Sequence, residues 1–150
     1  MIRRFSHIGI SVADLNRSIG FYTGLLDLEL LAAPFPFSGP LFSQVMALED
    51  AAGRIGVVRK GDLQLELFEF SNPAPATQAI DRPVNARGLT HFGIEVDDID
   101  AAYDRLAGAG VRLHCPVTRF PGGVRATYAR DPDGNVFELL EMPASRRASP

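Results

Sequence analysis

The chain repeats part of its own sequence, and this repeat restricts the fold more than any other feature. The segment SHIGISVADLNRSIGFYTGLL begins at Ser6, and the similar segment THFGIEVDDIDAAYDRLAGAG begins at Thr90. Their alignment pairs identical residues: His7 with His91, Gly9 with Gly93, Ile10 with Ile94, Val12 with Val96 and Asp14 with Asp98. Such internal similarity predicts two copies of one supersecondary unit.

A second correspondence follows later in each half. Leu65-Glu66-Leu67 in the first half matches Phe137-Glu138-Leu139 in the second. More residues separate the matched segments in the first half, so that half carries the longer insertion. Proline and glycine cluster in APFPFSGP, at positions 33–40, which indicates where the insertion lies.

Each half opens with a short β-rich run, FSHIGISV or LTHFGIEV, followed by an aspartate and a segment with helical spacing. Asp14 or Asn16 could cap the first helix, and Gly110 is placed to end the second. The later runs RIGVVRK, DLQLELFEF, VRATYAR and NVFELLEM are typical of strands, and a further strand is expected near VRLHCPV.

These elements predict an α+β protein made of two tandem βαβββ modules. We expect the first module over residues 1–71, a linker rich in proline and alanine over 72–87, the second module over 88–142 and a flexible tail over 143–150.

Composition excludes several classes of protein. With 46% hydrophobic and 22% charged residues, the chain has the composition of a soluble globular protein. The net charge of −3 and the scattered basic residues argue against nucleic-acid binding, and no apolar run is long enough to span a membrane. The N-terminus lacks the apolar core of a signal peptide, and the single cysteine, Cys115, fits a reducing cytoplasm.

Strand alternation predicts which side chains meet. In the first strand Ile8, Ile10 and Val12 share the face that packs under a helix, so His7 points to the opposite face. The same reasoning puts Glu66 opposite its neighbouring leucines, and His91 and Glu138 follow the same pattern in the second half. Each module therefore offers one imidazole and one carboxylate on the same side of its sheet.

Such a set suits one divalent metal ion. Imidazole and carboxylate donors favour Zn, Ni, Co, Mn or Fe over soft Cu(I). Four protein donors, His7, Glu66, His91 and Glu138, leave one or two positions at which a substrate oxygen could bind, so we expect a catalytic site. We interpret Glu69 and Glu141 as solvated or edge residues, because they alternate with the ligands. We interpret His114 and Cys115, beside Pro116, as surface or packing residues.

The motifs quoted above, together with LQLELFEF and the closing YARDPDGNVFELLE, resemble the vicinal oxygen chelate superfamily, which includes glyoxalase I, methylmalonyl-CoA epimerase, extradiol dioxygenases and proteins of fosfomycin and bleomycin resistance. The resemblance covers nearly the whole chain, and the DPDG-x-x-x-E-L pattern is its most specific element. It implies a cupped eight-stranded mixed sheet, assembly as a homodimer, and metal ligands at the four positions already identified.

The number of ligands distinguishes the reactions of this superfamily. Extradiol dioxygenases use two histidines and one carboxylate and would not need Glu66. The full His-Glu-His-Glu set is most similar to glyoxalase I and close to the epimerase. The resemblance therefore implies a lyase or isomerase that acts on a small carbonyl compound through a metal-stabilised enediolate, with Glu138 as the proton shuttle and Glu66 as the second choice. An extradiol dioxygenase and a non-enzymatic antibiotic-binding protein are the alternatives.

One departure concerns the substrate. Bacterial glyoxalase I carries Asn-Trp-Gly shortly after the second ligand, where the asparagine helps to hold glutathione, but this chain has Leu67-Phe68-Glu69-Phe70-Ser71 after Glu66. Phe68 with Phe35, Phe37 and Phe42 predicts a more apolar mouth. We therefore expect a small-molecule substrate other than a glutathione adduct, and we consider Arg59, Arg119 or Arg125 as holders of a substrate carboxylate.

Overall fold

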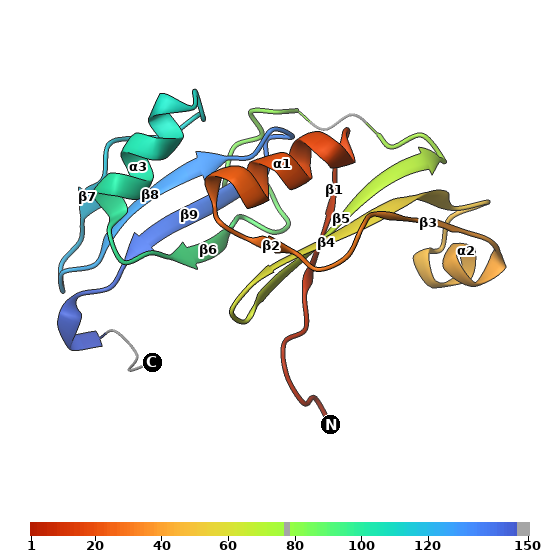
Figure 1. Ribbon diagram of the computed structural model, residues 1–150, viewed down its shortest axis with the longest axis horizontal. Coiled ribbons are helices and arrows are strands. Elements are labelled where there is room, and N and C mark those ends of the chain that lie inside the picture. Colours follow the sequence, from red (N-terminus) through yellow and green to blue (C-terminus); the bar gives the residue numbers. More distant parts are fainter. Residues whose placement is uncertain (77–78, 147–150) are drawn as a thin grey trace. The chain divides into compact units, whose positions relative to one another are not determined.

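The structure is a computed structural model that describes residues 1–76 and 79–146 (Figure 1). The chain divides into two compact units, Met1–Thr77 and Gln78–Pro150. The boundary between the units falls inside the stretch 72–87. Among the described residues, no helix is long and apolar enough to cross a membrane.

Unit 1 is a five-stranded sheet with two helices. Its elements are, in chain order, β1 (Ile8–Ser11), α1 (Leu15–Leu25), β2 (Glu29–Leu30), β3 (Phe35–Ser38), α2 (Pro40–Met46), β4 (Ala52–Lys60) and β5 (Leu63–Asn72). The strand order is β1-β5-β4-β2, and β3 also pairs with β4. β1 runs parallel to β5, whereas the other pairs are antiparallel. Helix α1 packs on β4 and β5.

Unit 2 repeats this plan with four strands. Its elements are β6 (Phe92–Glu95), α3 (Ile99–Gly108), β7 (Thr118–Arg119), β8 (Arg125–Arg130), β9 (Val136–Glu141) and a short 3-10 helix (Ala144–Arg146). The strand order is β6-β9-β8-β7, with β6 parallel to β9. Both units therefore place their first strand beside their last, which brings the two matched motifs of each half together.

The α+β class is confirmed: unit 2 is βαβββ, and unit 1 has the same order with β3 and α2 added between β2 and β4. The strands form two mixed sheets of five and four, because the insertion contributes β3 and is followed by α2. Pro36 is tolerated because β3 pairs with β4 alone, and Pro40 occupies the first turn of α2, where a missing N–H costs nothing.

The strand expected near residues 111–117 needs correction. The run at 111–117 forms one isolated bridge, Leu113 with Ala129, and the strand begins only at Thr118. Within the tail expected at 143–150, residues Ala144–Arg146 form the 3-10 helix, and residues 147–150 lie outside the described chain.

The matched aspartates begin the matched helices. Asp14 accepts a hydrogen bond from the backbone N–H of Arg17 and Asp98 accepts one from that of Ala101, each at 3.0 Å. Helices leave their first N–H groups without partners, and an aspartate at this position satisfies one of them. Gly110, at φ +74°, lies just beyond the end of α3, as predicted.

Glu69 and Glu141 are a second pair of helix supports, which corrects their interpretation as solvated or edge residues. Glu69 accepts from the N–H of Leu15 at 3.4 Å, and Glu141 accepts from the N–H of Ile99 at 2.9 Å. Their side chains are only 26% and 17% exposed. A carboxylate at this end of a helix also interacts favourably with the helix dipole. β5 and β9 therefore each support the start of a helix from the face opposite Glu66 or Glu138.

The core of each unit lies between sheet and helix, and its residues share complete or nearly complete burial. They are Leu15, Tyr22, Val58, Leu65 and Leu67 in unit 1, and Ile99, Leu106, Ala129, Phe137 and Leu139 in unit 2. Glu66 and Glu138 each lie between two of these residues along the strand, so they point to the other face of the sheet, as predicted.

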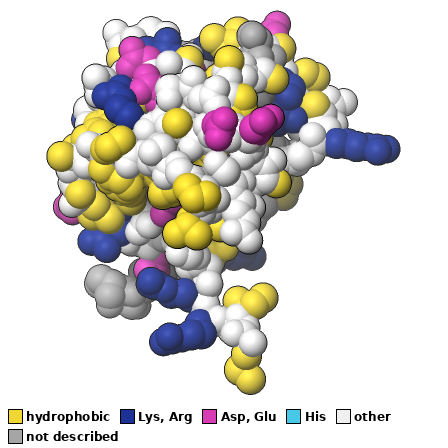
Figure 2. Space-filling model, turned by 90° about the vertical axis from the view of Figure 1, so that its right-hand side faces the viewer, with side chains coloured by type: hydrophobic (Ala, Val, Ile, Leu, Met, Phe, Trp, Pro, Cys, Tyr) yellow, Lys and Arg dark blue, Asp and Glu magenta, His cyan; other side chains and the backbone are white. Residues whose placement is uncertain are grey.

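Helix α2 exposes apolar side chains. Leu41 is 75% exposed and Val45 is 86% exposed. Figure 2 looks at the side on which α2 lies in Figure 1 and shows hydrophobic side chains gathered on part of that face. The other side of the insertion is internal, because Phe37 is 2% exposed and packs with Phe42, Phe68 and Phe70.

Candidate metal and substrate site

Each unit brings one predicted histidine and one predicted glutamate into contact. His7 immediately precedes β1, and its Nε2 lies 3.5 Å from Oε2 of Glu66 on β5. His91 immediately precedes β6, and its Nε2 lies 3.4 Å from Oε2 of Glu138 on β9. The parallel pairing of first and last strands produces both contacts.

The other imidazole nitrogen is held in the same way in both units. Nδ1 of His7 lies 3.2 Å from the hydroxyl of Ser6, and Nδ1 of His91 lies 3.0 Å from that of Thr90. A proton on Nδ1 that is donated to the hydroxyl leaves the lone pair of Nε2 directed toward the carboxylate. Metal-binding histidines commonly have their second nitrogen held by such a contact. The two repeated segments begin at Ser6 and Thr90, but the alternation of residues along the strands does not predict that their hydroxyl groups contact the histidines.

The matched glycines lie beside the carboxylates. Gly9 pairs with Glu66 and Gly93 pairs with Glu138 in the strand register. A Cβ at Gly93 would lie 3.8 Å from Oε2 of Glu138 and 3.1 Å from Cδ2 of Leu140. Gly93 therefore leaves space next to the carboxylate of Glu138, whereas a Cβ at Gly9 would lie 3.5 Å from the ring of Phe68.

The two pairs have a spacing that a metal ion requires. Two donors at about 2.1 Å from one ion lie about 3.0 Å apart at a right angle and about 3.4 Å apart at the tetrahedral angle. The observed separations of 3.5 and 3.4 Å are close to the second value. Within neither unit do the described residues group three or more histidine, cysteine, aspartate or glutamate side chains around one point. Each unit therefore brings two candidate donors together.

Tyr128 on β8 adds a hydroxyl to the pair in unit 2. It pairs with Glu138 in the strand register, and its hydroxyl lies 3.5 Å from Nε2 of His91. The two rings are in contact, with centroids 4.6 Å apart. Burial, and to a smaller extent the carboxylate of Glu138, raises the pKa of Tyr128, so the phenol stays protonated. The corresponding partner of Glu66 is Val57, so sequence repetition gives no signal for this residue.

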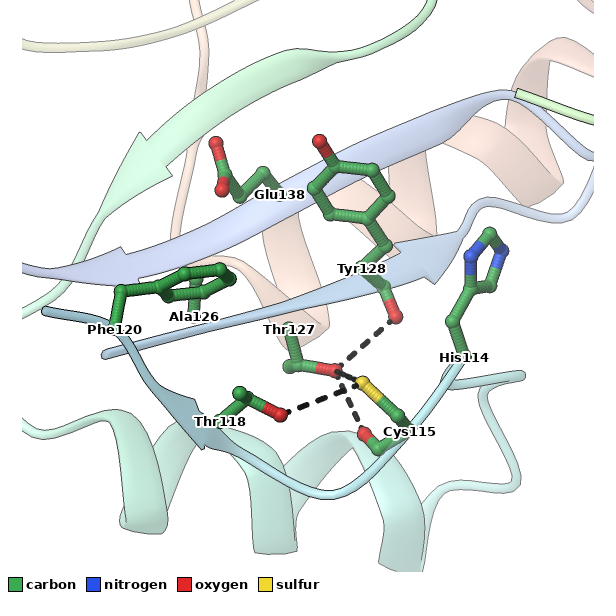
Figure 3. A pocket seen from close by; sticks show the side chains of 8 residues that line it. All are labelled: His114, Cys115, Thr118, Phe120, Ala126, Thr127, Tyr128 and Glu138. Atoms are coloured by element: carbon green, nitrogen blue, oxygen red, sulfur yellow. Dashed lines mark hydrogen bonds between the residues drawn. The ribbon is translucent and has the colours of Figure 1, made fainter. Parts of the chain in front are cut away.

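A cavity of about 300 Å³ lies next to Glu138 within unit 2 (Figure 3). The residues that line it are His114, Cys115, Thr118, Phe120, Ala126, Thr127, Tyr128 and Glu138. His114 and Cys115, interpreted from the sequence as surface or packing residues, therefore face this cavity. They follow the isolated bridge at Leu113, and the hydroxyl of Thr127 donates to the carbonyl of Cys115 at 2.7 Å.

The arginines considered as carboxylate holders differ in their surroundings. Arg125 donates to Asp100 on α3 at 2.6 Å, and this hydrogen bond lowers the pKa of Asp100. Arg119 also lowers the pKa of Asp100, although to a smaller extent. Both arginines therefore act on the helix side of the sheet. Arg59 pairs with Gln64 on β5, which puts it on the same face as Glu66.

The phenylalanines expected at an apolar mouth are divided. Phe37, Phe42 and Phe68 pack against one another in unit 1, where Phe37 is a buried centre, whereas Phe35 is 44% exposed. The insertion packs inward because its apolar residues cover the part of the sheet face beyond Glu66.

Comparisons with known proteins agree with this architecture. A family model of the Glyoxalase/Bleomycin resistance protein/Dioxygenase superfamily matches residues 4–139. The uncharacterized protein YaeR of Escherichia coli K12 is 30% identical over 143 residues, which are 94% of this chain and 98% of YaeR. A probable lactoylglutathione lyase of Vibrio cholerae is 29% identical over 147 residues, covering 92% of this chain and 90% of that protein.

Solved structures show the same fold. The crystal structure of a glyoxalase family protein from Bacillus cereus matches with a TM-score of 0.86 and 26% identity, covering 94% of this chain and 95% of that one. The family match spans both βαβββ units and all of the strands that carry the His–Glu pairs except the last two residues of β9. The chain is a member of the Glyoxalase/Bleomycin resistance protein/Dioxygenase superfamily.

Proposed function

We propose that the protein is a metal-dependent lyase or isomerase that moves a proton at a carbon next to the carbonyl group of a small compound. The observation that carries the proposal is the duplicated His–Glu pair, with the same nitrogen-to-oxygen separation and the same hydroxyl contact behind each histidine. Two largely buried carboxylates, each 3.4–3.5 Å from a histidine nitrogen, would be costly to keep unless they serve a ligand.

The four donors His7, Glu66, His91 and Glu138 would hold one divalent ion. When bound, the ion supplies Lewis acidity at the carbonyl oxygen of the substrate. Imidazole and carboxylate donors suit Zn, Ni, Co, Mn and Fe alike, so the geometry of the site and the availability of the metal, rather than raw affinity, would decide which ion occupies it.

Glu138 is the proposed proton shuttle, and Glu66 is the second choice. Glu138 lines the cavity next to the proposed site, so a substrate held there would present its acidic carbon to this carboxylate. A carboxylate within hydrogen-bonding reach can take the proton from carbon and return it to a neighbouring atom. The hydroxyl of Tyr128, protonated and on the same face, can donate to the oxygen on which negative charge develops.

A glutathione adduct is not the proposed substrate. The sequence lacks the asparagine that would hold glutathione after Glu66, and the buried Phe37 occupies the neighbourhood of Phe68. This chain would then differ from the probable lactoylglutathione lyase of Vibrio cholerae in the compound that it binds.

Titration with Co²⁺, followed by its visible absorption, tests the ligand set. Each of the variants His7→Ala and Glu138→Ala is expected to lose at least about tenfold in affinity for Co²⁺. Removing a residue that only hydrogen-bonds to a metal ligand already costs about tenfold or more, and removing the ligand itself should cost no less. His114→Ala is the matched control, since His114 is the third histidine of the chain and lies outside the proposed set. A His7 or Glu138 variant that binds as tightly as the parent would show the assignment to be wrong.

The reaction is tested by exchange of solvent deuterium into hydroxyacetone, followed by NMR. The metal-loaded parent is expected to exchange the protons next to the carbonyl, and Glu138→Gln is expected to slow the exchange by roughly 100-fold or more, which is typical for loss of a general base. Oxygen uptake on catechols with bound Fe(II), without exchange, would instead favour a ring-cleaving dioxygenase.

The four donors could come from one chain or from two chains of a homodimer. Mixing the variants His7→Ala and His91→Ala separates these cases. If the units of two chains pair, half of the mixed dimers' sites regain both histidines and bind Co²⁺ as the parent does. If the units pair within one chain, mixing restores no site.

A further inference from the structure

The two units treat the same face of their sheets differently. In unit 1, Phe68 lies two residues after Glu66 and packs on Phe37 of the insertion, with ring centroids 6.0 Å apart. In unit 2, the small Ala126 pairs with Leu140, two residues after Glu138, and the space above it is part of the cavity. The region that the first unit fills with its own aromatic rings is therefore open in the second.

The cavity has two distinct ends, which Figure 3 shows. Glu138 and the hydroxyl of Tyr128 lie at one end. Cys115 lies at the other, where its sulfur is 4.0 Å from the hydroxyl of Thr118 and 3.8 Å from that of Thr127. A ligand that reacts at Glu138 would extend its remaining part toward Cys115.

The wall between these ends is apolar and carries no fixed positive charge. Among the described residues that line the cavity there is no lysine or arginine. Burial, followed by the effect of Arg130 and Arg112, lowers the pKa of His114, so near neutral pH this ring is uncharged. A carboxylate at the Cys115 end would lack a cation partner there, and its desolvation would oppose binding.

The ring of Phe120 is only partly covered by the rest of the described chain. It lines the cavity, and 51% of its surface is exposed, so folding buries only about half of this apolar side chain. Its ring lies at the cavity wall, on the side away from His114 (Figure 3). An apolar ligand that covered this ring would gain the free energy that folding does not provide.

We propose that the cavity of unit 2 binds an uncharged aromatic or branched aliphatic group carried by the reacting carbonyl compound, between Phe120 and Tyr128 and above Cys115. The inference rests on the proposed function, because it assigns the tail of that substrate. A volume of about 300 Å³ is at the lower end for ligand sites and suits a group the size of a substituted phenyl ring.

The alkylation rate of Cys115 can be used to test whether a ligand occupies the cavity. Cys115 is the single cysteine of the chain, it is exposed and it lines the cavity, so alkylation by iodoacetamide reports whether the cavity is occupied. The metal-loaded protein is alkylated in the presence of 2-hydroxyacetophenone or of 5-hydroxy-4-oxopentanoate, and the modified fraction is followed by intact mass. Both compounds are α-hydroxyketones, but the first carries a phenyl group and the second a carboxylate. Alkylation of free cysteine under the same conditions corrects for direct effects on the reagent.

We expect 2-hydroxyacetophenone to slow alkylation of Cys115 at least about tenfold over a concentration series, and the carboxylate compound to leave the rate unchanged. Phe120→Ala should weaken the protecting affinity by about tenfold, because an aromatic contact and its apolar area are lost. Ala126→Leu should remove protection by filling the cavity. Leu41→Ala, which truncates an exposed apolar side chain on α2, is the control and should not alter protection.

Equal protection by both compounds, protection by the carboxylate compound alone, or no protection by either would overturn the inference. Full protection of Cys115 in the Phe120→Ala variant would also overturn the inference. Phe120 is half exposed, so this variant should fold and remain informative even if Ala126→Leu does not fold. Deuterium exchange into the same two compounds reports separately on the proposed function. Exchange without protection refutes the cavity assignment alone, and protection without exchange refutes the proposed reaction alone.

Discussion

Glu141 supports the start of α3 from the strand that also carries Glu138, and replacing it should destabilise the fold more than replacing its repeat partner Glu69. The N–H of Ile99 donates to Glu141 at 2.9 Å, whereas the N–H of Leu15 donates to Glu69 at 3.4 Å. Arg54 lies 2.6 Å from Glu69 and its side chain is 44% exposed, whereas Arg125 lies farther from Glu141, at 3.7 Å.

The magnitudes follow from these contacts. A hydrogen bond to a charged acceptor contributes about 1.5–3 kcal/mol, and a carboxylate at a partly buried helix N-terminus adds about 0.3–2 kcal/mol. Glutamine keeps an acceptor oxygen but loses the charge, so Glu141→Gln should reduce the free energy of unfolding by about 1–2 kcal/mol. Glu69→Gln loses a long hydrogen bond and an exposed ion pair, which contributes about 0–1 kcal/mol.

Urea unfolding at low salt and at about 1 M NaCl measures the difference. Salt screens exposed pairs much more than partly buried hydrogen bonds. The effect of Glu69→Gln should therefore shrink at high salt, while that of Glu141→Gln should largely remain. Glu141 lies on the opposite face of β9 from Glu138, so its variant should keep the Co²⁺ affinity of the parent. Equal losses in the two variants, or a larger loss for Glu69→Gln, would refute this account of how the strands hold the helices.

Three further predictions concern protonation, backbone conformation and metal. The pKa of His114 is lowered from 6.5 in the folded state, so at pH values just below 6.5 the folded protein binds fewer protons than the unfolded chain. Stability should therefore fall as the pH drops below about 6.5. In metal-free protein, His114→Gln should reduce this pH dependence of the urea midpoint. Gly134 has φ +85°, and a Cβ there would overlap the backbone of Ile80, so Gly134→Ala should destabilise the protein by more than about 1 kcal/mol in thermal melts. Gly20 lies in α1 with open space around it, so Gly20→Ala should stabilise the protein by about 0.5–1 kcal/mol in the same melts. Removing the metal with EDTA should lower the melting temperature of the parent protein. If the ion is present at 100 times its dissociation constant, the loss corresponds to about 2.7 kcal/mol of stability. The His7→Ala variant should show a smaller decrease.

The repeat and the alternation of strands were enough to predict the two βαβββ units and the face on which each His–Glu pair lies. This worked because a strand has a period of two, so the buried leucines on each side of Glu66 determine its direction without knowledge of the neighbouring strands. The capping role of Asp14 and Asp98 was predictable for a similar reason, since a cap is a local interaction within a few residues of the chain.

Other features depend on contacts between segments that are distant in the sequence. Alternation put Glu69 and Glu141 on the face opposite Glu66 and Glu138, but only the packing of a helix start against the last strand shows that they accept hydrogen bonds from Leu15 and Ile99. The insertion was recognised from its prolines, but its strand and helix form because Phe37 has Phe68 and Phe70 to pack on.

The sequence alone determined the modules, the faces of their strands and the two His–Glu pairs proposed as metal donors, because these follow from periodicity and repetition. The tertiary structure decided that Ser6 and Thr90 hold the imidazoles, that Tyr128 joins the pair in unit 2, and that His114 and Cys115 line a cavity beside Glu138. The physical reason is that strand register and the path of the chain before β7 are set by packing over the whole unit, and a cavity is a property of all the residues around it rather than of any one segment.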